Sequence, residues 1–65
     1  MTWTVKYVEN GRLAGRVVLK EEFGDGKFQV IASICDGGWL KTHKGALISE
    51  EQTKQMWKFW MLYGI

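Results

Sequence analysis

The chain has 65 residues, of which 46% are apolar, and its formal net charge is +2. This length predicts one domain over residues 1–65, near the lower limit for a chain that folds without disulfides or metals. The apolar content argues against disorder, and four tryptophans provide bulk for a small core. The longest apolar run, Phe59 to Tyr63, is too short to span a bilayer.

Cys35 is the only cysteine, so no intramolecular disulfide can form. A domain of this size in an oxidising compartment usually contains disulfides, and this composition therefore favours a reducing one. The N-terminus is polar and lacks the apolar stretch of a signal peptide. We therefore expect a cytoplasmic protein.

The first predicted elements are two strands joined by a hairpin. Thr2 to Val8 alternates between apolar and polar residues, and a second alternating strand is expected over residues 12–21. A two-residue Asn10-Gly11 loop would place an arginine on the apolar face, so we predict a three-residue loop over residues 9–11, with Gly11 in the left-handed region. This register pairs Tyr7 with Leu13, Val5 with Gly15 and Trp3 with Val17.

Glycine-rich turns separate the remaining strands. A loop over residues 22–27 precedes the most strand-like segment, residues 28–35. Alternation places Phe28, Val30, Ala32 and Ile34 of that segment on one face. Asp36-Gly37-Gly38 forms the next turn. The sequence allows a sheet of either three or four strands, and in the second case residues 39–44 form the short fourth strand.

Residues 49–64 form the only predicted helix. Ser49 and Gln52 have the spacing of a capping box, and Glu50 and Glu51 fall where the helix dipole favours negative charge. Gly64 is expected just past the last turn, with Ile65 folding back. One face of this helix consists of Met56, Phe59, Trp60 and Tyr63.

These elements predict the α+β class: an antiparallel meander of three or four strands with one C-terminal helix packed on one face. Strand phases and the helix face converge on one expected core. Its members are Trp3, Val5, Tyr7, Leu13, Val17, Phe28, Val30, Ile34, Met56 and Trp60.

No residue set in the sequence has the pattern of a catalytic or metal site. Cys35 and His43 lack the further ligands that zinc needs and the third group that a thiol nucleophile needs. Two pairs of adjacent glutamates occur, at 21–22 and 50–51. The two side chains of each pair point in different directions, so they cannot act together on one substrate bond. Neither Gly24-Asp25-Gly26 nor residues 36–38 has the context of a phosphate loop. We expect no enzymatic activity, cofactor or metal.

Two surfaces are candidate binding sites. The predicted register points a basic stripe away from the helix, and strands with such residues can bind nucleic acid in a groove. Its members are Lys6, Arg12, Arg16 and Lys20. The alternative is a solvated face whose charges protect the sheet edges.

The second surface is the helix after Lys58, which is apolar on every side, so part of it must meet a partner protein or a second copy of the chain. The residues expected there are Lys54, Trp57, Lys58, Met61 and Leu62.

The sequence thus favours a small non-enzymatic binding protein that acts through protein–protein contact. On size alone, we expect an accessory or inhibitor protein of the kind encoded by phages and other mobile elements. The alternative is a nucleic-acid-binding module that uses the basic sheet face.

Overall fold

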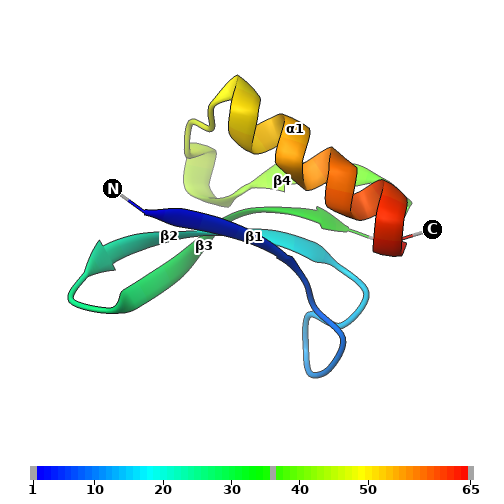
Figure 1. Ribbon diagram of the computed structural model, residues 1–65, viewed down its shortest axis with the longest axis horizontal. Coiled ribbons are helices and arrows are strands. Elements are labelled where there is room, and N and C mark those ends of the chain that lie inside the picture. The colour runs from blue at the N-terminus through cyan, green and yellow to red at the C-terminus, as the bar shows by residue number, and fades with distance from the viewer. Residues whose placement is uncertain (1, 36, 65) are drawn as a thin grey trace.

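The computed structural model describes residues 2–35 and 37–64. Asp36 of the predicted turn and Ile65, expected to fold back, lie outside the described residues. Four antiparallel strands in the order β1-β2-β3-β4 form one sheet, and α1 lies across one face of it (Figure 1). The elements are β1 (Trp3–Tyr7), β2 (Val17–Gly24), β3 (Lys27–Cys35), β4 (Trp39–Thr42), the 3-10 turn η1 (His43–Gly45), α1 (Glu50–Phe59) and the π-helical turn η2 (Trp60–Gly64). The predicted α+β meander is confirmed, with a true fourth strand.

The predicted register of the first hairpin is wrong by four residues. Tyr7 pairs with Val17 and Val5 pairs with Leu19, so residues 8–16 form a long connection instead of a three-residue loop. The connection makes its own hydrogen bonds, among them the Gly15 amide to the Val8 carbonyl at 2.8 Å. Shifting the strand pairing by an even number of residues keeps every side chain on its predicted face. The observed pairing places the larger Leu19, rather than Gly15, beside Val5.

A bulge in β3 divides that strand into two phases. Leu19 pairs with Ala32 while Lys20 pairs with Val30, which leaves Ile31 as the extra residue. Ile31 and Ala32 are both buried in the core under α1, and Val30 lies on the other face with Lys20. The predicted placement of Phe28 and Val30 beside Ala32 is therefore wrong, because one inserted residue inverts the alternation before it.

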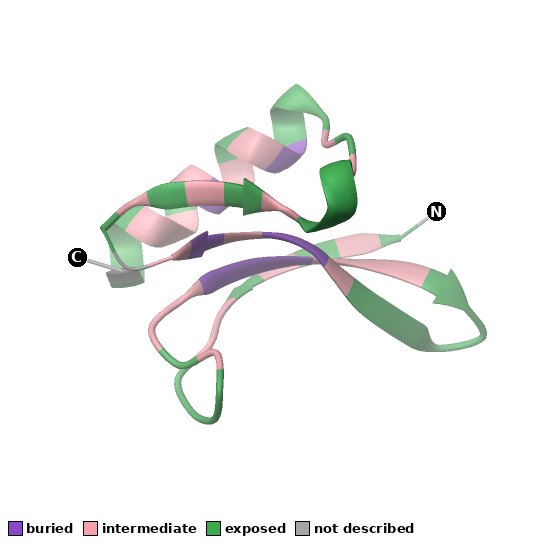
Figure 2. Cartoon of the chain, turned by 180° about the vertical axis from the view of Figure 1, so that it is seen from behind, coloured by how far each residue is buried: buried purple, intermediate pink, exposed green. Residues whose placement is uncertain are grey.

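The core lies between the sheet and α1, and the buried stretches of β2 and β3 run beneath the helix (Figure 2). Its buried members are Val17, Leu19, Ile31, Ala32, Ile34 and Met56. The expected members Trp3, Val5, Tyr7 and Trp60 pack around it half-buried. Leu13, Phe28 and Val30 were wrongly assigned to it: Leu13 lies in the 8–16 connection, and Phe28 lies near the exposed tip of the β2–β3 hairpin.

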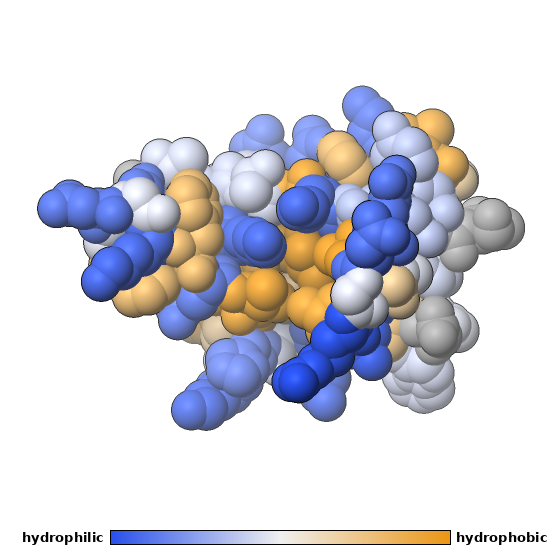
Figure 3. Space-filling view, turned by 90° about the horizontal axis from the view of Figure 1, so that it is seen from below, coloured by the Kyte–Doolittle hydropathy of each residue, from blue (hydrophilic) through white to orange (hydrophobic). Residues whose placement is uncertain are grey.

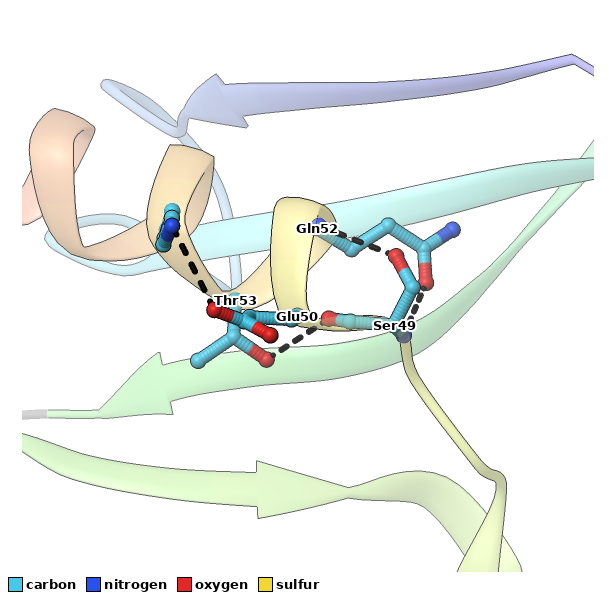
Figure 4. A network of polar contacts seen from close by, with 5 residues as sticks. Ser49, Glu50, Gln52 and Thr53 are labelled. Carbon is cyan, nitrogen blue, oxygen red and sulfur yellow. Dashed lines mark hydrogen bonds and ion pairs between the residues drawn. The ribbon is translucent and has the colours of Figure 1, made fainter.

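The start of α1 has the predicted capping box (Figure 4). The Gln52 amide donates to Ser49 Oγ at 3.1 Å, and the Ser49 amide donates to Gln52 Oε1 at 2.8 Å. The helical stretch ends in η2, and Gly64 lies inside that turn rather than beyond it. This cap fixes where α1 begins.

Candidate functional site

The structure does not bring the two catalytic candidates together. Cys35 pairs with Trp39 at the start of β4, whereas His43 follows Thr42 at the end of that strand. Four residues of extended chain, about 13 Å, therefore separate their positions along the strand, well beyond hydrogen-bond reach. Within residues 2–35 and 37–64, no three His, Cys, Asp or Glu side chains converge as a metal site would require.

A groove runs along the outward side of α1 and is lined almost entirely by apolar surface. We call it the helix groove; its lining residues are Glu50, Thr53, Lys54, Trp57, Lys58 and Met61. These positions recur at the three- and four-residue spacing that puts side chains on one helical stripe. Four of the five residues predicted for the helix surface therefore line one continuous feature.

The apolar members of the helix groove differ in how well they are anchored. Trp57 is half-buried and packs against the core, so its ring is held by the fold. Met61 is 71% exposed, and Leu62, the fifth predicted residue, is 64% exposed but lies outside the groove lining. Lys54 forms an exposed ion pair with Glu50 at 3.3 Å. In the described structure Lys58 has no such ion pair. The groove thus has a half-buried aromatic wall, an exposed apolar end and a cationic rim.

The sheet face opposite α1, which we call the open face, has an apolar middle bordered by charged side chains (Figure 3). Val18 lies at its centre, with Lys6 and Ser33 as its cross-strand neighbours, and exposes 0% of its surface. Lysine and arginine side chains commonly cover apolar surface with their stems while their charges stay in water. Lys6, directly beside Val18, is placed to cover it in this way.

The predicted basic stripe is only partly assembled on the open face. Lys6 and Lys20 lie on it, as alternation along β1 and β2 requires, and Arg16 lies where the chain enters β2. Arg12 does not join them on a strand, because it lies in the 8–16 connection. The stripe gains a residue that sequence reasoning missed: Lys41 pairs with Ser33 and so extends the row Lys6–Val18–Ser33 across all four strands. Alternation along the possible fourth strand over residues 39–44 was the signal in the sequence that could have identified it.

A hollow of about 180 Å³ lies between β3 and β4, and we call it the basic hollow. Arg16, Lys41 and His43 line it together with Ser33, Val30 and parts of Ala32 and Thr42. Two fixed cations, an imidazole and a hydroxyl around one small space are the groups that bind anions such as phosphate. No carboxylate is among the lining residues.

No helix in the described part of the chain combines the length and the apolar character that crossing a bilayer demands. Comparisons of the chain with protein-family models, with curated proteins and with solved structures found no match. The helix groove and the open face, on opposite sides of the molecule, are therefore the two candidate functional surfaces.

Proposed function

We propose that this chain is a non-enzymatic protein-binding module that docks a partner protein in the helix groove and works in the cytoplasm, where its free Cys35 stays reduced. The observation that carries the proposal is the groove's apolar lining, with Trp57 and Met61 beside each other on one stripe. Tryptophan and methionine are enriched at protein interfaces, and tryptophan is a frequent hot spot. A small chain of this kind can regulate or inhibit a partner simply by covering its surface.

The rim of the groove indicates the chemistry of the partner. Lys54 is already paired with Glu50, whereas Lys58 stands beside the apolar floor without a described ion pair. A partner segment with an apolar residue over Trp57 would cover the apolar floor, and a carboxylate near Lys58 would pair with its charge. Such charge complementarity acts mainly on the rate of association and on specificity.

A photo-cross-linking amino acid placed at position 61 tests this proposal in extracts of the producing cells. Met61 is exposed, so the replacement leaves the fold intact, and the same probe at Thr4 on the open face is the matched control. We expect a cross-linked product of discrete mass from position 61 and none from position 4. Excess wild-type protein should compete it away, while a Met61→Lys, Lys58→Glu variant should not.

The cross-linked protein is then purified, and its affinity for each variant is measured. At least a tenfold loss for Met61→Lys, with no loss for Lys20→Gln on the open face, supports the proposal. Equal cross-linking from both positions contradicts it, as does the absence of any product. A product of twice the chain mass would identify a second copy as the occupant, which would replace the partner by a homodimer paired through α1.

A second candidate function is nucleic-acid binding through the open face. The observation that favours it is the gathering of Lys6, Arg16, Lys20 and Lys41 around one apolar centre, opposed on that face by Glu22. Glu22 accepts a hydrogen bond from the Gly26 amide at 3.2 Å, near the hairpin tip and away from Lys41. Phosphate contacts from Lys and Arg supply most of the non-specific affinity of nucleic-acid-binding proteins.

A further inference from the structure

The open face has the dimensions and side chains of a site for a single nucleic-acid strand. We propose, resting on the second candidate function above, that it binds single-stranded nucleic acid, with one phosphate in the basic hollow and a base stacked on Trp39. The ligand is defined by its phosphates and unpaired bases, and a duplex is the alternative that the test below separates.

The width of the sheet argues against insertion into the major groove of a duplex. The major groove of B-DNA is about 12 Å wide and admits a helix or a two-stranded ribbon. Lys6 on β1 and Lys41 on β4 lie three strand spacings apart, and at roughly 4.8 Å each these amount to about 14 Å before any side chain is added. A face of this width cannot enter that groove flat, but a single strand can lie across it.

Trp39 supplies the stacking platform next to the phosphate site. It is 75% exposed, and it lies two residues before Lys41 on the same face of β4. That spacing is about 7 Å, a separation that one nucleotide can bridge between its phosphate and a neighbouring base. A Cβ added to Gly37 would come within 3.4 Å of Trp39 Cδ1, so the indole leans on the glycine turn and keeps most of its surface free. Base–aromatic stacking tolerates any sequence because every base has a π face.

The basic hollow is suited to a phosphate rather than to a whole nucleotide. Its volume of about 180 Å³ is below that of typical small-molecule pockets. Arg16 offers a bidentate donor pair, Lys41 a point charge and Ser33 a hydroxyl, which together can hold several phosphate oxygens. The adjacent Lys20 and Lys6 lie where the flanking phosphates of a bound strand would pass.

Fluorescence anisotropy with labelled 12-mers of dT and rU, and with a 12-base-pair duplex, tests the proposal at low salt. We expect the single strands to bind more tightly than the duplex, with a logarithmic salt slope of about 0.7 per contacted phosphate. Arg16→Gln with Lys41→Gln should weaken binding at least tenfold and lower that slope by about 0.7, the share of the one phosphate in the basic hollow. Trp39→Ala should weaken it by about 5- to 150-fold, and Trp39→Phe should restore part of the loss.

The matched control, Lys54→Gln with Lys58→Gln, removes the same number of positive charges from the side of α1. It should leave the affinity within twofold of the wild type. If these variants lose as much affinity as Arg16→Gln with Lys41→Gln, binding reflects net charge alone and the proposal fails. Tighter binding of the duplex would overturn the single-strand inference while leaving nucleic-acid binding in place. Failure of every oligonucleotide to bind would remove both.

Discussion

Tyr7 and Tyr63 stack on each other with ring centroids 5.8 Å apart and 25° between the ring planes. Tyr7 closes β1 and Tyr63 belongs to η2, so the contact joins the first strand to the last turn of the chain. Phe59 lies against Tyr63, with a distance of 5.8 Å between the ring centroids and an angle of 48° between the ring planes. The three rings hold η2 against the sheet although Met61 and Leu62, between two of them, remain exposed.

We expect the Tyr7–Tyr63 pair to contribute a coupling free energy of about 0.5–1.5 kcal/mol, the range for stacked aromatic pairs. A double-mutant cycle with Tyr7→Ala and Tyr63→Ala, followed by urea unfolding, measures it. Tyr63→Phe is the control, because it keeps the ring. Additive effects of the two alanine substitutions would show that η2 is not docked through this contact.

Engineered disulfides distinguish the observed register of β1 and β2 from the shorter hairpin. Thr4 pairs with Lys20 in the structure, whereas a three-residue loop would pair it with Arg16. In a Cys35→Ser background, cysteines at 4 and 20 should oxidise to a bridged monomer, because directly opposite Cα atoms lie within disulfide range. Cysteines at 4 and 16 should stay reduced as the monomer. Mass spectrometry after mild oxidation reads both, and the reverse result would contradict the register.

Loss of the capping box should lower stability without touching either proposed surface. Ser49→Ala removes the acceptor for the Gln52 amide, and we expect a cost of about 0.5–2 kcal/mol in the free energy of unfolding. Ser49→Asn retains a side-chain oxygen at this position and should cost far less. Thermal unfolding monitored by circular dichroism compares the two. Equal melting temperatures would mean that the cap contributes nothing.

Gly11 tests the long connection through its backbone alone. Its φ is +92°, and an added Cβ would meet nothing within 4 Å, so Gly11→Ala introduces conformational strain without a clash. We expect a loss of about 1 kcal/mol or more. Gly24→Ala is the matched control, since its Cβ would meet only Lys27 Cδ, at 4.0 Å, and its φ is not in the left-handed range. Denaturant midpoints should fall for the first variant only.

Local patterns in the sequence were sufficient for the helix and for the inward side of β1. The capping box joins residues three apart, and the apolar face of α1 repeats every three or four residues, so both follow from short-range geometry. The helix groove could be predicted for the same reason: Lys54, Trp57, Lys58 and Met61 share a stripe whatever the sheet does. Alternation likewise placed Trp3, Val5 and Tyr7 on the covered side.

Tertiary structure alone decided the register, the bulge and the composition of the open face. Pairing Tyr7 with Leu13 or with Val17 buries the same side of β1, so alternation along the strand cannot choose between the two registers. The observed register is the one that buries Val17, Val18 and Leu19 between two neighbouring strands. The bulge falls in Val30-Ile31-Ala32, an apolar run in which either phase presents apolar residues to the helix. Lys41 reaches the basic hollow only because β4 pairs with β3. No repeating pattern within a single strand predicts that pairing. The helix groove therefore follows from local sequence, and the basic hollow exists only once the strands have paired.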